Sequence, residues 1–138
     1  TPAAAIMTPV LAKYVDFFSI GTNDLVQYTL ACDRGNANIA HLYNHFNPAV
    51  LRLIQTTIRS AKEAGIWAGM CGEMASDPHA AVLLLGMGIS ELSMSAPSIP
   101  RVKEKLRSVS SMEAKEILAG VMKMEDADEI KNYLAKIL

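Results

Sequence analysis

The sequence predicts an α/β domain built on a parallel β-sheet. Three short, mostly apolar segments, 16–20, 66–70 and 91–94, are bounded by glycine, proline or polar residues, as is typical of strands buried in a parallel sheet. Helical segments separate them, and this alternation indicates parallel pairing through right-handed crossovers. The chain has 138 residues, 51% of them hydrophobic, so we expect one compact domain with a sizeable core.

The segment between the first two strands has clear helical signals. Asn47 is placed as an N-cap, Pro48 suits the first helical position, and Gly65 suits the end of the helix. The apolar positions repeat at helical spacing, which predicts that one face is buried. That face consists of Leu51, Ile54, Ile58 and Ala61.

The remaining helices are expected around and after the third strand. Asp77-Pro78 opens a helix that Gly86 and Gly88 close. Three more helices begin near Pro100, Ser111 and Asp126. For the last two we expect capping boxes, Ser110 with Glu113 and Asp126 with Glu129.

Length leaves two architectures open. A (β/α)8 barrel takes about 250 residues, or roughly 31 per unit, so 138 residues supply about four and a half units. The chain is therefore either a small open α/β sheet or the last part of a barrel whose first strands lie elsewhere.

Composition excludes several classes of partner. Thirteen Lys and Arg against fourteen Asp and Glu give a formal charge of −1, which provides no general attraction for nucleic acid. The longest apolar stretch, 80–89, contains two glycines and is too short to cross a membrane, so we expect no membrane insertion. With two cysteines and no basic leader, a cytoplasmic location fits best.

Candidate functional residues follow the predicted strands. In parallel α/β folds, functional groups lie beyond the carboxyl ends of the strands, which selects 21–24, 71–73 and 95–98. Asn23 and Asp24 offer an amide and a hard metal ligand, which suits phosphate with magnesium. The long connection 31–47 could bring Arg34 onto a phosphate.

Each candidate also has a purely structural interpretation. Asn23 and Asp24 could cap a helix, Arg34 could be solvated, and Cys71 could be a small core residue. His41 and His45 are spaced for metal binding on a helix but have no evident third ligand, which favours loop histidines.

Three segments, 16–30, 33–36 and 69–75, together resemble the phosphoenolpyruvate-utilising enzymes. The resemblance runs from Thr1 to about Arg101 and is strongest to the enzyme I branch of the family, the phosphoenolpyruvate–protein phosphotransferases of bacterial sugar uptake. Pyruvate phosphate dikinase and phosphoenolpyruvate synthase share the Asn-Asp and Cys-Gly pairs, so they remain alternatives. The resemblance implies that residues 1–138 are the last three βα units of a C-terminal (β/α)8 barrel, with extra C-terminal helices.

The resemblance also implies roles for four residues. Asp24 would be a Mg²⁺ ligand, Asn23 and Arg34 would hold the phosphoryl group, and Cys71 would donate a proton to C3 of the enolate. The reaction would transfer phosphate from phosphoenolpyruvate to a protein histidine and release pyruvate. In the family a second metal ligand, a glutamate, directly precedes the segment that begins here at Thr1, so we expect this chain alone to be inactive.

The partners implied by the resemblance lie outside this chain. They are a phosphocarrier protein, which would act through a separate histidine-bearing domain, and a second copy in a homodimer. A different interpretation treats the chain as a non-catalytic dimerisation module. A third treats Cys71 as a redox-active thiol, although no paired cysteine lies in its segment.

Overall fold

The computed structural model describes residues 1–138 and contains one three-stranded parallel sheet. The strands are β1 (Phe17–Gly21), β2 (Trp67–Cys71) and β3 (Glu91–Leu92), in the order β1-β2-β3. All three predicted strands are confirmed, although β3 is shorter than the expected 91–94. Its pairing continues beyond its end, because the N–H of Ser93 donates to the carbonyl of Met70 at 2.8 Å.

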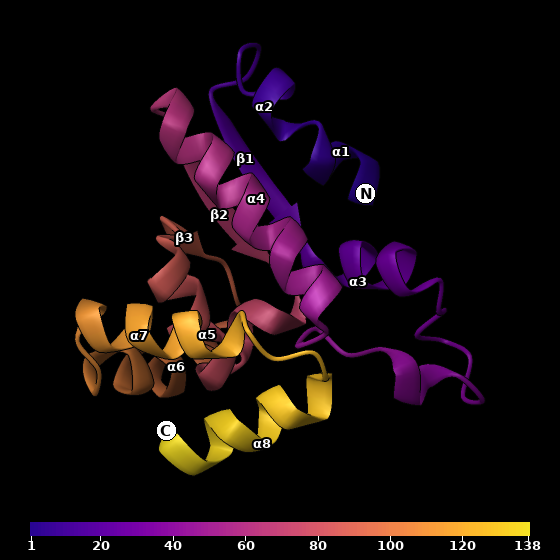
Figure 1. Ribbon diagram of the computed structural model, residues 1–138, viewed down its shortest axis with the longest axis vertical. Coiled ribbons are helices and arrows are strands. Elements are labelled where there is room, and N and C mark those ends of the chain that lie inside the picture. Colours follow the sequence, from indigo (N-terminus) through magenta and orange to yellow (C-terminus); the bar gives the residue numbers. More distant parts are fainter.

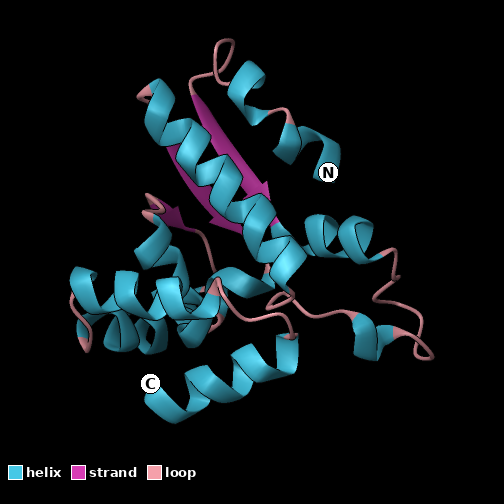
Figure 2. Cartoon of the chain, in the orientation of Figure 1, coloured by secondary structure: helices cyan, strands magenta, loops and turns pink.

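The chain also contains eight α-helices (Figures 1 and 2). They are α1 (Pro2–Ile6), α2 (Thr8–Leu11), α3 (Thr22–Leu30), α4 (Pro48–Ala64), α5 (Pro78–Met87), α6 (Ile99–Arg107), α7 (Ser111–Val121) and α8 (Ala127–Ile137). Short 3-10 turns, η1 (Ala40–Leu42), η2 (Glu73–Ser76) and η3 (Ala96–Ser98), lie in the connections. Helices α1 and α2 pack beside α4, whereas α5, α6 and α7 form a separate group near β3. None of the helices is both long enough and apolar enough to span a membrane.

The ends of α4 are as predicted. The side chain of Asn47 accepts a hydrogen bond from the N–H of Ala49, and Gly65 ends the helix with φ +72°. A left-handed residue at this position is most easily glycine, because other residues place a Cβ against the backbone. Two local signals therefore determine both ends of this helix.

Helix α5 departs from the prediction at one glycine. Asp77 caps it and Gly88 ends it, but Gly86 lies inside the helix rather than closing it. A Cβ on Gly86 would lie 2.5 Å from the carbonyl oxygen of Ala114 in α7. The glycine is therefore required by close packing of α5 against α7 and not by chain reversal.

The two expected capping boxes differ. Ser110 and Glu113 exchange both bonds at the start of α7, so this box is confirmed. At α8 only half of the box forms: the carboxylate of Asp126 accepts from the N–H groups of Asp128 and Glu129, and Glu129 gives no bond in return. The short carboxylate satisfies both amides, which is sufficient to start the helix.

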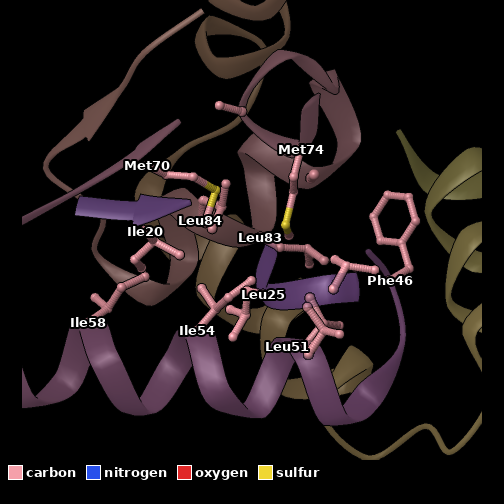
Figure 3. Packing of buried hydrophobic residues seen from close by; sticks show 14 of the residues in the cluster. Ile20, Leu25, Phe46, Leu51, Ile54, Ile58, Met70, Met74, Leu83 and Leu84 are labelled. Carbon is pink, nitrogen blue, oxygen red and sulfur yellow. The ribbon is translucent and has the colours of Figure 1, made fainter. Parts of the chain in front are cut away.

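The core lies between α4 and one face of the sheet (Figure 3). Ile54 and Ile58 of α4 point toward Ile20 of β1 and Met70 of β2. The whole predicted face of α4 is buried, which confirms the prediction from periodicity. Leu83 and Leu84 of α5 and Met74 of η2 extend the same core toward the carboxyl ends of the strands.

The other face of the sheet is open. Phe17 of β1 and Trp67 of β2 stack there with ring centroids 4.4 Å apart, and they remain 46% and 41% exposed. Parallel sheets usually have both faces covered, since their strands are apolar on both sides. Three parallel strands with helices on one face are consistent with part of an α/β barrel.

Candidate functional site

The carboxyl ends of β1 and β2 bring two polar turns together. Gly21 and Cys71 are paired in the sheet register, so the segments after them start side by side. The first is the start of α3, with Asn23 and Asp24, and the second is Gly72-Glu73. The expectation that both turns open at the same end of one sheet is confirmed (Figure 1).

Two hydrogen bonds join these turns. The hydroxyl of Thr22, a residue only 1% exposed, donates to the carbonyl of Cys71 at 3.0 Å. In the other direction, the N–H of Glu73 donates to Oδ1 of Asn23 at 3.2 Å. These bonds link residues about fifty positions apart, so they fix the site through tertiary structure.

Gly72 makes this approach possible. Its φ is +101° and its ψ is −176°, a conformation that is essentially restricted to glycine. A Cβ at this position would lie 2.5 Å from Oγ1 of Thr22 and 3.1 Å from Oδ1 of Asn23. Both the backbone angle and the available space therefore require glycine.

Asn23 and Asp24 do not cap α3, so the capping interpretation is wrong. The N-cap position is Gly21, and no side chain bonds the first turn. Asn23 directs its amide oxygen to the other turn instead, and the carboxylate of Asp24 makes no hydrogen bond or ion pair. A carboxylate in the first turn of a helix is favoured by the helix dipole even without a capping bond.

The connection from α3 to α4 returns to the site at two points. Nη1 of Arg34 lies 3.7 Å from Oε1 of Glu73, and both side chains are at least half exposed. Such an exposed pair contributes little to stability, but it keeps the guanidinium near the turn after β2. The structure therefore brings Arg34 into the group that contains Asn23.

Tyr43 is the second point of return, and sequence reasoning did not select it. Its hydroxyl lies 3.2 Å from the backbone oxygen and 3.4 Å from Oδ1 of Asn23. Burial, together with the negative charges of Glu73 and Asp24, raises the pKa of this phenol and outweighs the opposing effect of Arg34. The hydroxyl therefore stays protonated and can donate. A tyrosine in a long loop gives no signal in the sequence that would predict this contact.

Cys71 is exposed, so its interpretation as a core residue is wrong. It ends β2, and its Sγ lies 3.7 Å from the carbonyl oxygen of Ile20 on the neighbouring strand. The other cysteine, Cys32, is 1% exposed and fits the role of a small core residue. Both thiols are free, so Cys71 has no disulfide partner in this chain.

The histidines do not form a metal site. Nε2 of His45 lies 3.5 Å from Oδ2 of Asp77, the residue that caps α5. Burial disfavours the charge on Asp77, but the close imidazole of His45 and hydrogen bonds from the N–H groups of Ala80 and His79 lower its pKa to about 2. No group of three His, Cys, Asp or Glu side chains could hold a metal ion.

Asp24 is nevertheless suited to share a magnesium ion. Mg²⁺ commonly takes one or two protein carboxylates and completes its shell with water and substrate phosphate. The carboxylate of Asp24 is exposed and uncommitted at the carboxyl end of the sheet. The residues present therefore fit a metal bound together with a substrate and do not fit a metal held by protein alone.

The site is an open surface. A pocket of about 110 Å³ lies beside β1 and includes Thr1 and Gly21, and another lies between His45 and Arg101. Neither includes Asn23 or Cys71. These two pockets therefore do not enclose the two adjacent turns, and the face of the sheet that carries Cys71 has no cover.

An amide, a carboxylate, an arginine and an exposed thiol at the carboxyl end of a parallel sheet are the kind of groups that α/β enzymes place at that end of their sheets. Residues 1–111 match the family model described as PEP-utilising enzyme, PEP-binding domain. The chain therefore belongs to the phosphoenolpyruvate-utilising enzymes, as the resemblance indicated.

Similar proteins are named phosphoenolpyruvate-protein phosphotransferase. The protein of that name from Buchnera aphidicola (subspecies Acyrthosiphon pisum) is 54% identical over 97% of this chain, and the one from Haemophilus influenzae is 51% identical over all of it. The Geobacillus stearothermophilus protein is 49% identical over 98% of the chain. The chain spans about a quarter of the length of these relatives, 24%, 24% and 23% respectively.

Proposed function

We propose that these residues supply part of a phosphoenolpyruvate site that transfers the phosphoryl group to a protein histidine and releases pyruvate. The observation that carries the proposal is the joining of two turns at one end of the sheet. The Thr22–Cys71 and Glu73–Asn23 hydrogen bonds join the turn that carries Asn23 and Asp24 to the end of the strand that carries the exposed thiol. The names of the relatives support the choice of substrate and acceptor.

The phosphate-binding role falls to Asn23 and Arg34. A guanidinium matches the geometry of phosphate oxygens, and Arg34 already lies against the turn after β2. The amide of Asn23 adds a neutral donor. Asp24 would hold Mg²⁺, which offsets the charge of a transferring phosphoryl group.

Cys71 is the proposed proton donor. When the bond between phosphorus and the enol oxygen breaks, its electron pair stays on the oxygen as an enolate. Carbon C3 of that enolate then takes a proton from Sγ, which gives pyruvate and a thiolate that solvent reprotonates. A free thiol is mostly protonated at neutral pH, and this one is exposed at the same end of the sheet as Asn23.

The remaining parts of the reaction belong to groups outside this chain. They are the acceptor histidine on a separate domain, a phosphocarrier protein that receives the phosphate, and further ligands for the metal and the phosphate. We further propose that the active protein is a cytoplasmic homodimer and that these 138 residues alone are inactive. The open face at Phe17 and Trp67 supports this last point, since it leaves the site without a cover.

The test is phosphotransfer from phosphoenolpyruvate by the full-length natural protein that contains these residues. Cys71→Ala should lower the rate by at least a hundredfold, because the proton donor is removed. Cys32→Ala is the matched control: it removes the buried thiol and should leave the rate within a few-fold of normal. Equal rates for both variants would refute the role of Cys71.

The metal assignment has its own test. Asp24→Asn keeps the shape of the side chain but removes the charge that a hard cation prefers. We expect the Mg²⁺ concentration for half-maximal activity to rise at least tenfold. An unchanged Mg²⁺ dependence would remove Asp24 from the ligands.

A non-catalytic association module is the second candidate. Ile6 of α1, Val10 of α2 and Met7 between the two helices are 63%, 44% and 48% exposed, which is unusual for neighbouring apolar side chains. If association were the sole role, sedimentation would show a dimer whereas Cys71→Ala would have no catalytic effect. Full activity in a strictly monomeric protein would exclude this candidate.

A further inference from the structure

The amide of Asn23 is held by its oxygen. Two donors reach Oδ1: the N–H of Glu73 at 3.2 Å and the hydroxyl of Tyr43 at 3.4 Å. A carboxamide has one acceptor oxygen and one NH2 group with two donors. Because the oxygen faces both donors, the NH2 group is the part that remains free, and it makes no hydrogen bond within the chain.

This orientation matters for an anionic ligand. The NH2 group can donate to a phosphoryl oxygen, whereas the carbonyl oxygen would repel it. A side-chain amide can turn by half a rotation about its last bond, so a single backbone donor leaves room for fluctuation. A second donor disfavours the turned state, because turning would place the NH2 group against both donors.

Tyr43 is placed to act as that second donor. It lies twenty residues beyond Asn23, and its single hydroxyl proton is shared between two oxygens of that residue, the backbone oxygen at 3.2 Å and Oδ1 at 3.4 Å. Contact with both the backbone and the side chain of one residue restrains that residue's whole conformation. The raised pKa of the phenol keeps its proton in place.

We propose that Tyr43 is a positioning residue that keeps the NH2 group of Asn23 directed at the phosphoryl group of the substrate. The inference rests on the proposed function. It adds a residue that acts through Asn23 and that need not touch the substrate.

Tyr43 could instead act by holding the loop that carries Arg34. The two mechanisms differ in which second residue the effect of a Tyr43 substitution depends on, Asn23 or Arg34. If Tyr43 acts through Asn23, removing its hydroxyl should have no further effect once the amide is gone. If it acts through the loop, the effect should disappear in the absence of Arg34.

The experiment is a pair of double-mutant cycles on phosphoenolpyruvate-dependent phosphotransfer by the full-length natural protein. Tyr43→Phe removes only the hydroxyl, and we expect kcat/KM to fall about tenfold, the loss typical of one hydrogen bond to an otherwise unsatisfied group. Tyr28→Phe is the matched control, since Tyr28 lies on α3, is 58% exposed and makes no hydrogen bond. It should leave kcat/KM unchanged.

Adding Tyr43→Phe to the Asn23→Ala and Arg34→Ala variants distinguishes the two mechanisms. In Asn23→Ala the additional Tyr43→Phe change should alter kcat/KM by less than twofold, whereas in Arg34→Ala it should still cost about tenfold. An effect of Tyr43→Phe that persists in Asn23→Ala, or that vanishes only in Arg34→Ala, would overturn the proposal. So would a single variant Tyr43→Phe with normal kcat/KM in a protein that Asn23→Ala inactivates.

Failure of the proposed function gives a different pattern. In that case the unsubstituted protein does not transfer phosphate from phosphoenolpyruvate, and the positioning role of Tyr43 is refuted together with the proposed function. Melting temperatures of all variants provide the structural control. A loss of activity in Tyr43→Phe that is matched by a large fall in melting temperature, and is additive with Asn23→Ala, would show a purely structural role and contradict the proposal.

Discussion

Gly72→Ala is the substitution with the most definite expected result. The new Cβ would lie 2.5 Å from Oγ1 of Thr22, and ordinary contact begins at 3.4 Å, so the hydroxyl must retreat by 3.4 − 2.5 = 0.9 Å. That movement breaks its hydrogen bond to Cys71, which contributes about 1 kcal/mol. The backbone conformation adds strain of about 1–3 kcal/mol for any residue with a Cβ.

Together these effects should lower the free energy of unfolding by about 2–4 kcal/mol. A shift of about 1 Å between reacting groups can also reduce a rate by about a hundredfold. We therefore expect Gly72→Ala in the full-length natural protein to lower both the melting temperature and the rate of phosphotransfer from phosphoenolpyruvate.

Gly65→Ala is the matched control for backbone strain. Gly65 has φ +72° and no atom within 4 Å of its would-be Cβ, and it lies at the end of α4. Alanine there should cost about 1 kcal/mol of stability and leave the phosphotransfer rate unchanged. If Gly72→Ala were as active and as stable as Gly65→Ala, the close approach of the two turns would be refuted.

Three further predictions concern stability and association. Asp77→Asn keeps the cap of α5 but loses a carboxylate whose pKa is lowered to about 2, so the variant should be about 1 kcal/mol less stable at pH 7, after allowance for the 30% exposed side chain. Because the pKa of Asp77 is lowered in the folded state, the difference in free energy of unfolding should have its full value above about pH 4 and should disappear as pH falls through about 2. Urea titrations at several pH values measure it, and a difference that does not change with pH would contradict the prediction. Gly86→Ala should separate α5 from α7 and lower the melting temperature by several degrees, whereas Gly88→Ala, with open space around it, should lower it less; the reverse order would disprove tight packing at Gly86. The isolated residues 1–138 should self-associate in sedimentation, because β1 and β3 are open sheet edges; a dilute, stable monomer would contradict this.

The sequence alone predicts those parts of the fold that depend on neighbouring residues. The helix from Pro48 to the residue before Gly65 follows from one cap, one proline, one glycine and a periodic apolar face. The three strands follow from short apolar segments between turn residues. Such signals act over a few positions, so a single sequence displays them directly.

Features that depend on distant contacts could not be predicted in this way. Gly86 resembles a helix-ending residue in the sequence, but it lies inside α5, at a position where the carbonyl of Ala114 leaves no room for a Cβ. In the same way, Tyr43 acquires its contact with Asn23 only when the loop folds back.

The same distinction between local signals and distant contacts applies to the candidate site. Asn23, Asp24, Arg34 and Cys71 were identified by their positions after strands or in a long loop, and the resemblance to a family suggested their roles. The structure adds the two hydrogen bonds that join the turns after β1 and β2, and the ion pair that holds Arg34 near Glu73. The family match supports phosphoenolpyruvate as the proposed substrate.

The most direct test is the structure of the full-length natural protein crystallised with Mg²⁺ and phosphoenolpyruvate. The central claim predicts that the metal binds the carboxylate of Asp24, that the phosphoryl group contacts Asn23, and that C3 of the substrate faces Sγ of Cys71. Binding of phosphoenolpyruvate away from the carboxyl ends of β1 and β2, or with C3 directed away from Cys71, would contradict it.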